Sequence, residues 1–227
     1  MPALATDLKH RSSAIVALDK IKNLIFSGDL IADSNYLETD LAQRLGMSRT
    51  PVRQATLMLE AQGLIEVQPR KGIKIKSISI QDMADIYEIL TELECLAARR
   101  AANAGLSKSD LSALMESIDE MVSALNVENR EAWAIADDAF HTELVRLGGN
   151  QRIESIVSNV TDQVRRVRAF TLHMRPLPTN SNKDHKKLYT AILKGDADAA
   201  HDIHRKHRCE ASELLIDLLN KARMKRV

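Results

Sequence analysis

The sequence has 227 residues, of which 44% are hydrophobic and 28% are charged, an ordinary balance that excludes a largely disordered chain. The formal net charge is only +1, but residues 1–78 carry 11 lysines and arginines against 8 acidic residues. Two cysteines, Cys95 and Cys209, are too few for a disulfide framework, and Cys95 is expected in the core.

The length suits two small domains, each large enough to bury a core of its own. The sequence contains no apolar run of membrane-spanning length, and its N-terminus lacks the apolar stretch of a secretion signal. We therefore expect a cytoplasmic protein that does not enter the membrane.

The first part of the chain predicts helices separated by glycines. Apolar residues recur at helical spacing from Ser13 onwards, and Gly28 can cap the C-terminus of this helix. The amphipathic segment 37–45 predicts a second helix, which ends at Gly46. Ser48 is expected to cap a third helix with its side-chain oxygen. The leucines expected to turn inward from this helix and beyond it are Leu57, Leu59 and Leu64.

Two alternating segments follow the third helix. Residues 65–68 and 73–76 alternate apolar and polar side chains, which is typical of half-buried strands. The turn between them carries Arg70 and Lys71, so the predicted hairpin has a basic tip. Three helices followed by such a hairpin are the layout of a winged helix-turn-helix, which we expect over residues 1–77.

Residues 78–227 predict an all-helical domain. Alanine and leucine dominate this region, and its breaks fall at glycine and proline. Ser107 and Asp110 match a capping box at the start of one helix. The expected fold class is mainly α, with an N-terminal winged helix-turn-helix and a C-terminal all-α helical bundle. The expected helices of the bundle cover 81–104, 107–125, 128–147, 150–173, 181–194 and 196–223.

Residues that can donate hydrogen bonds to DNA gather at the start of the third helix. Between Arg44 and Lys76 there are seven basic residues against two acidic ones. Arginine can bind guanine with two hydrogen bonds, hydroxyl groups suit phosphates, and a helix N-terminus attracts phosphate. A solvated basic face is the common alternative. The candidate DNA contacts are Ser48, Arg49, Thr50 and Arg53, with Arg70 and Lys71 at the hairpin tip.

Six of the seven histidines follow residue 140. Asp137 and His141 lie four residues apart on one predicted helix, so their side chains share a face. His185 and His207 fall on the last two helices. One carboxylate and three imidazoles suit zinc, and also nickel, manganese or iron, and leave positions open for water or a carboxylate. Spacing alone does not select this set, because the competing ligands are Asp138, His201 and His204.

The segment from Leu41 to Arg53, LAQRLGMSRTPVR, resembles the GntR family of bacterial regulators. The resemblance continues through LEAQGLI at 59–65 and PRKG at 69–72. It implies that DNA is contacted by Ser48, Arg49, Thr50 and Arg53. Many members carry arginine where Thr39 stands here, so we expect one contact of the family to be missing.

Residues 80–220 are similar to the FCD ligand-binding domain of the FadR-type branch of that family, in its shorter six-helix form. The motifs are DDAFH, which ends at His141, the stretch from His185 to Asp196, and His207. The resemblance implies a divalent metal, zinc foremost, held by Asp137, His141, His185 and His207. It leaves His201 and His204 at the surface, and Asp138 facing solvent or another helix.

Many members also carry an arginine near Leu90 and Thr91, where it serves as the anion-binding group of the ligand pocket. Arg165, Arg166 and Arg168 are candidates to replace it, although a solvated or dimer-facing stripe explains them equally well. Arg165 and Arg168 are the residues that we assign to effector binding.

The two resemblances together imply a homodimeric transcription regulator rather than an enzyme. It would repress from a palindromic double-stranded DNA operator and leave it when a small carboxylate binds at the metal. Two alternatives remain open. The metal ion itself can be the signal, or the second domain can be a metal-dependent hydrolase fused to a DNA-binding module.

Overall fold

The computed structural model describes residues 12–224, which form two compact units. The first unit comprises the described residues up to Ile78 together with Asn159–Ala169. The second comprises Ser79–Ser158 and the described residues from Phe170 onward. Within the described range, no helix is both long enough and apolar enough to cross a membrane.

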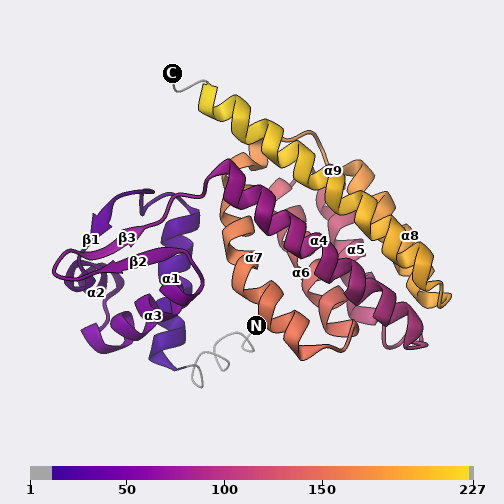
Figure 1. Cartoon of the computed structure of the whole chain (residues 1–227), viewed down its shortest axis with the longest axis horizontal. Coiled ribbons are helices and arrows are strands. Elements are labelled where there is room, and N and C mark those ends of the chain that lie inside the picture. The colour runs from indigo at the N-terminus through magenta and orange to yellow at the C-terminus, as the bar shows by residue number, and fades with distance from the viewer. Residues whose placement is uncertain (1–11, 225–227) are drawn as a thin grey trace. The chain divides into compact units, whose positions relative to one another are not determined.

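The first unit contains a small sheet and three helices of its own (Figure 1). Strand β3 lies at the centre of the sheet and pairs antiparallel with both other strands. The β2–β3 pairing aligns Ile65 with Ile75 and Val67 with Ile73. The chain order is α1 (Ser13–Phe26), β1 (Asn35–Tyr36), α2 (Glu38–Leu45), α3 (Arg49–Ala61), β2 (Ile65–Gln68) and β3 (Gly72–Ile75).

One hydrophobic core joins the helices of this unit to the hairpin. Ile21 of α1, Leu59 of α3 and Ile73 of β3 are fully buried in it. The expectation that Leu57 turns inward is wrong, because its side chain is 53% exposed. Residues two apart on a helix point about 200° away from each other, so burying Leu59 turns Leu57 outward.

The start of α3 differs in one respect from the sequence expectation. Ser48 occupies the N-cap position of α3, but its side chain makes no capping hydrogen bond. The predicted cap is therefore wrong, although the helix begins where it was expected. The hydroxyl group of Ser48 lies at the exposed end of the helix instead.

The turn between β2 and β3 depends on two left-handed backbone positions. Arg70 has a φ of 66° and Gly72 a φ of 85°. A Cβ atom on Gly72 would lie 2.2 Å from the carbonyl oxygen of Tyr36, a residue of β1. Only glycine tolerates both the conformation and this close approach. The basic hairpin tip is thus built on a turn that packs against β1.

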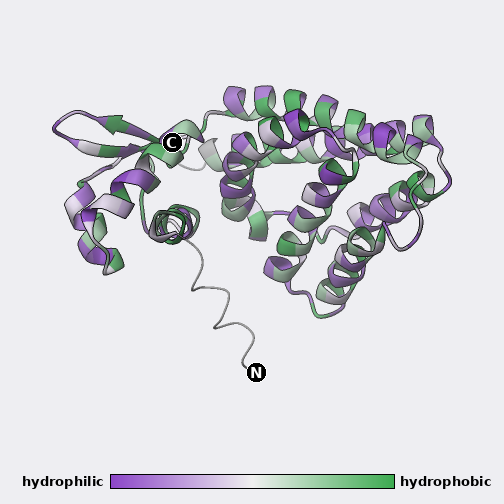
Figure 2. Ribbon diagram, turned by 90° about the horizontal axis from the view of Figure 1, so that it is seen from below, coloured by the Kyte–Doolittle hydropathy of each residue, from purple (hydrophilic) through white to green (hydrophobic). Residues whose placement is uncertain are grey.

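The second unit is all-helical, so the predicted fold class, mainly α with a winged helix and a helical bundle, is confirmed. Figure 2 shows that its helices carry both hydrophobic and hydrophilic residues along their length. Helix α7 is shared, since its middle part groups with the first unit. The elements are α4 (Ile80–Asn103), α5 (Ser112–Asn126), α6 (Arg130–Leu147), α7 (Gln151–Thr171), the 3-10 turn η2 (Leu172–Met174), α8 (Thr179–Leu193) and α9 (Ala197–Met224).

Helix α4 runs beside α9 and also packs on α6 (Figure 1). At the end of α6, a Cβ atom on Gly148 would lie 2.8 Å from the Cα of Ala97, so the two backbones meet closely. Arg100 of α4 adds a hydrogen bond of 2.6 Å from Nε to the Gly148 carbonyl oxygen. These contacts fix α4 against α6, and both helices supply residues of the site described next.

The core of this unit contains Phe140, Leu114 and Leu188, all buried. Cys95 is fully buried as expected, and burial, followed by the nearby Glu94 charge, raises the pKa of its thiol to about 12. Helix α5 begins later than the capping-box pattern predicts. Ser107 and Asp110 do form the reciprocal hydrogen bonds, but they enclose a turn that precedes the helix.

Candidate metal centre and nucleic-acid interface

The four predicted metal ligands come together inside the second unit. Asp137 and His141 lie one turn apart on α6, His185 lies on α8 and His207 on α9. The Nε2 atoms of His185 and His207 are 3.3 Å apart. The Asp137 carboxylate lies 3.6 Å from His185 Nε2 and 3.7 Å from His141 Nε2. All four side chains are buried, so the donor atoms converge away from bulk water.

This arrangement fits a divalent metal ion. The three imidazoles each offer a nitrogen, and these nitrogens all lie within 4.8 Å of one another. Two nitrogens bound to zinc at a tetrahedral angle lie about 3.3 Å apart, because each Zn–N bond is about 2.0–2.1 Å long. Burial, together with the neighbouring imidazoles of His185 and His141, lowers the pKa of His207 well below its ordinary range. A neutral imidazole keeps the lone pair that a metal binds.

A second layer of polar residues lies behind His141. Its Nδ1 atom is 2.9 Å from Oε2 of Glu94, a buried residue of α4. His204 of α9 approaches the same oxygen through Nε2, also at 2.9 Å. When Nδ1–H donates to Glu94, His141 presents its Nε2 lone pair toward Asp137 and His185. Such carboxylate–histidine contacts orient metal ligands in many proteins.

The charge on Glu94 follows from its surroundings. Burial by itself raises the pKa of this carboxyl group. The positive charge of Arg208 and the interactions with His141 and His204 outweigh burial and hold the pKa well below its usual range. Glu94, His141 and His204 also group as possible metal ligands. We interpret them as a hydrogen-bonded layer, because both imidazoles lie at hydrogen-bond distance from one oxygen.

The sequence-based placement of His204 at the surface is wrong. His204 is fully buried, and burial is the main cause that lowers its pKa to about 4. It lies on α9 three residues before His207, so the two side chains share a face. His201 is half-buried and contacts Asp202, and Asp138 is also half-buried.

The second candidate interface is at the start of α3. Ser48, Arg49, Thr50 and Arg53 are all exposed there, and Arg70 and Lys71 are exposed at the hairpin tip. Two other basic residues of this region are paired with acidic neighbours: Arg44 with Asp29 and Lys74 with Asp33. Within residues 12–224, no ion pair is formed by Arg49, Arg53, Arg70 or Lys71. These four cations are therefore available to phosphates and base edges.

Both candidate sites lie in regions of the chain that match known protein families. Residues 16–75 match the family described as "Bacterial regulatory proteins, gntR family", and residues 85–208 match the family described as "FCD domain". The chain belongs to the GntR family and carries an FCD domain. It is a DNA-binding transcriptional regulator.

Relatives of this GntR-family chain are named as regulators of transcription. The HTH-type transcriptional repressor RspR of Escherichia coli (strain K12) is 30% identical over 186 residues, which cover 81% of each chain. The HTH-type transcriptional regulator in the TAR-I ttuE-ttuC' intergenic region of Agrobacterium vitis is 37% identical over 131 residues, which are 57% of this chain and 77% of that protein.

Solved structures of regulators share the fold of this GntR-family chain. E. coli McbR/YncC aligns with a TM-score of 0.78 at 18% identity, covering 91% of this chain and 98% of the other. A putative GntR transcriptional regulator from Rhodococcus sp. RHA1 aligns with a TM-score of 0.73 at 21% identity, covering 91% and 99%. At these identities the likeness shows the fold alone.

The predicted effector residues of this GntR-family chain and the histidine cluster belong to different compact units. Arg165 and Arg168 fall within Asn159–Ala169, which groups with the winged helix. Arg165 also lies 3.5 Å from Asp162 of its own helix. Their role in effector binding stays a prediction. Glu94 and Arg208 lie beside the predicted ligands and were missed from sequence, whereas His204 was named as a competing ligand but placed at the surface.

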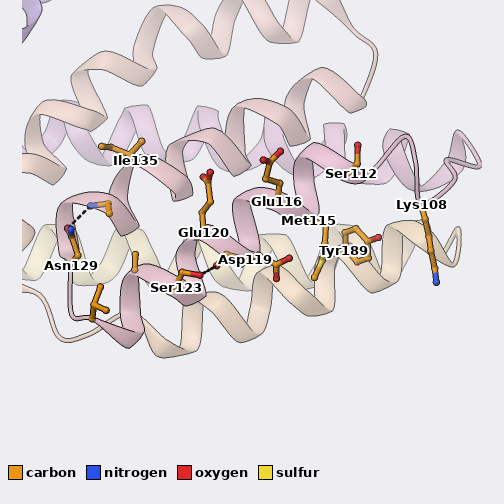
Figure 3. A pocket seen from close by; sticks show the side chains of 13 residues that line it. Lys108, Ser112, Met115, Glu116, Asp119, Glu120, Ser123, Asn129, Ile135 and Tyr189 are labelled. Atoms are coloured by element: carbon orange, nitrogen blue, oxygen red, sulfur yellow. Dashed lines mark hydrogen bonds between the residues drawn. The ribbon is translucent and has the colours of Figure 1, made fainter. Parts of the chain in front are cut away.

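An open groove of about 990 Å³ lies over α5 in the same unit (Figure 3). Tyr189 and Met115 line part of it, and Lys108 lies toward one end. Its other charged lining residues are acidic, namely Glu116, Asp119 and Glu120, and no histidine lines it. An acidic lining disfavours an anion. The histidine cluster is therefore the better candidate for binding a carboxylate.

Proposed function

We propose that this regulator is a repressor that leaves a palindromic operator when a small carboxylate binds at a metal ion in its helical domain. The observation that carries the proposal is the convergence of Asp137, His141, His185 and His207 from three helices into one buried cluster. A bound ion would supply open coordination positions for a carboxylate oxygen.

Some residues of the cluster would bind the ion, and another would orient these metal-binding side chains. Asp137 and the three histidines would bind the ion, zinc foremost, with nickel, manganese or iron as alternatives. Glu94 orients His141 from behind through the contact at 2.9 Å. The side chains of these residues bring α6, α8 and α9 into contact. Ligand binding at this meeting point would shift how the three helices pack.

We propose that DNA is read by the first turns of α3 and by the hairpin tip. Arg49 and Arg53 lie four residues apart on the exposed face of α3, which suits insertion into the major groove. Arg70 and Lys71 would reach the adjacent phosphates or minor groove. The missing arginine at Thr39 removes one contact, and the exposed hydroxyl groups of Ser48 and Thr50 remain to bind phosphate.

A homodimer would place two such helices on inverted half-sites. Helix α4 offers a surface for it. Ile89 and Leu96 are 48% and 44% exposed, and the half-buried Leu93 lies between them on the same face. Covering this apolar stripe with that of a second copy would remove it from water. Sedimentation equilibrium of the purified chain tests this point, because a monomer at micromolar concentration would contradict it.

A thermal-shift screen against small carboxylates tests the effector site. The panel is acetate, lactate, malonate and citrate, measured with zinc-loaded and with metal-stripped protein. A ligand present at a hundred times its Kd stabilises the folded state by about 2.7 kcal/mol. For a chain of this size that is a rise in Tm of roughly 5–10 °C.

We expect at least one carboxylate to raise the Tm of the zinc-loaded protein and not that of the metal-stripped protein. The same shift without metal would contradict a metal-anchored site. Stabilisation by zinc alone, with no carboxylate effect, would favour the alternative in which the ion is the signal. Consumption of the carboxylate during incubation would favour the enzyme alternative.

A further inference from the structure

Arg208 is a buried guanidinium group whose hydrogen-bonding capacity is largely unused. Only 3% of the residue is exposed. Its Nε and Nη2 atoms are buried and have no hydrogen-bond partner in the described part of the chain. Arginine is rarely buried unless its N–H groups are paired, and a buried donor without an acceptor is strongly unfavourable. The group therefore points to an acceptor that belongs to a ligand.

The neighbours of Arg208 do not supply that acceptor. The nearest carboxylate oxygen, Oε2 of Glu94, lies 3.6 Å from Nε, which is beyond hydrogen-bond distance. That oxygen already lies 2.9 Å from both His141 Nδ1 and His204 Nε2. On another side the guanidinium carbon is 4.7 Å from the centre of the Tyr87 ring. The ring covers the guanidinium group but accepts no in-plane N–H bond.

The position of Arg208 places it next to the candidate metal centre. It follows the predicted ligand His207 directly on α9 and shares a face with His204 one turn earlier. The oxygen of Glu94 that faces Arg208 is the one that contacts His141. One carboxylate thus lies between the guanidinium group and a metal ligand.

The charges of the cluster favour an anionic ligand. Glu94, Asp137 and Arg208 are the buried side chains of this region that can carry a full charge. With neutral imidazoles, a divalent ion and Arg208 together would exceed the two carboxylates by one positive charge. Burying a net charge is unfavourable unless a counter-charge accompanies it. A monoanion is the ligand that restores balance, and a carboxylate matches the two N–H groups of a guanidinium fork.

We propose that Arg208 binds the carboxylate group of a small monoanionic effector at the metal centre. The inference rests on the proposed function, because it concerns the same site. Arg208 would then bind the anion in place of Arg165 and Arg168, the candidates from the sequence analysis, and it lies in the same compact unit as the histidine cluster. The effector would satisfy the buried N–H groups and neutralise the cluster in one step.

The test compares zinc-loaded wild-type protein with Arg208→Gln and with a control, Arg205→Gln. Arg205 lies on the same helix but is exposed and pairs with Glu92 at the surface. Binding of acetate and lactate is measured by isothermal titration calorimetry, with acetamide as the uncharged probe, and zinc content is measured in each protein. We expect Arg208→Gln to retain zinc and to bind the carboxylate about 10- to 100-fold more weakly. We expect Arg205→Gln and the wild type to bind the carboxylates with equal affinity, and acetamide to bind to none of the proteins.

Arg208→Lys keeps the charge beside Glu94 but lacks the planar fork, so it serves if the glutamine variant does not fold. We expect it to weaken binding at least several-fold. Full carboxylate affinity in a zinc-loaded Arg208 variant would overturn the inference and leave the arginine a structural role. If the wild type binds no carboxylate on the panel, the proposed function itself fails. If the wild type binds a carboxylate and the Arg208 variants bind it equally well, only the inference about Arg208 is overturned.

Discussion

Glu94 accepts two hydrogen bonds through one oxygen, from His141 and His204, and so orients a predicted metal ligand from behind. The family resemblance predicts the four ligands but not the contacts of this second layer. A signal was present, because Glu94 is a charged residue on the apolar face of the helix that also carries Leu90 and Ala98. What spacing cannot show is which atoms of different helices meet.

The burial of His204 was predictable from the same kind of reasoning. His204 and His207 are three residues apart and share a helix face, so burying one of them buries the other as well. The sequence interpretation treated His204 as a residue outside the motif and therefore exposed. Its contact with Glu94 of α4 depends on how α4 and α9 pack, which periodicity does not reveal.

Removing two of the predicted ligands tests the metal centre. We expect His185→Ala combined with His207→Ala to lose the bound metal, because half of the predicted ligands are gone. The helical domain should also melt at a lower temperature, since bound metal stabilises the folded state. Metal content by plasma mass spectrometry and Tm by calorimetry check both effects.

The matched control changes two histidines outside the cluster, His173 and His201. His173 is largely exposed and His201 is half-buried, and neither belongs to the groups of possible metal ligands. This double variant should keep its metal and its Tm. Full metal occupancy in the first variant would show that the ligands were assigned wrongly.

At the scale of elements, helical periodicity and glycine breaks placed most helices to within a few residues. The helix expected over 128–147 forms over Arg130–Leu147, and that expected over 181–194 forms over Thr179–Leu193. The late start of α5 was missed because Ser107 and Asp110 cap a turn rather than the helix. Strand β1 was missed because it has only two residues and owes its existence to pairing with β3.

The predicted DNA contacts of helix α3 are tested by substituting Arg53. Arg53→Ala should weaken binding to an operator by about 1–3 kcal/mol, or roughly 5- to 150-fold, because a base or phosphate contact is lost. The operator is obtained by selecting bound sequences from a random DNA pool with the wild-type protein, and affinity is measured by fluorescence anisotropy. Metal content and Tm should not change, since Arg53 is exposed and distant in sequence from the cluster.

Arg152→Ala is the control for this experiment. Arg152 is also an exposed arginine on a helix, but it lies at the start of α7 in the all-helical unit. Its variant should bind the operator like the wild type. Equal affinity of the Arg53 and Arg152 variants would remove α3 from the DNA interface.

At the scale of the whole molecule, the proposed function requires that the two units influence each other. The winged helix has its own core around Ile21 and Leu59, and the metal-ligand cluster lies in the other unit. A carboxylate at the cluster can release DNA only if the bound and free states differ in operator affinity. Coupling of this kind is typically about 1–3 kcal/mol, or 5- to 150-fold in affinity. Sequence patterns predict both sites but carry no measure of that coupling.

Coupling between the metal centre and DNA binding is tested by the operator affinity of the zinc-loaded protein, measured with and without the carboxylate that raises its Tm. We expect saturating carboxylate to weaken operator binding by about 5- to 150-fold, and metal-stripped protein to show no such response. Operator affinity that is unchanged by a carboxylate bound at the metal centre would show that the bound carboxylate does not release the operator.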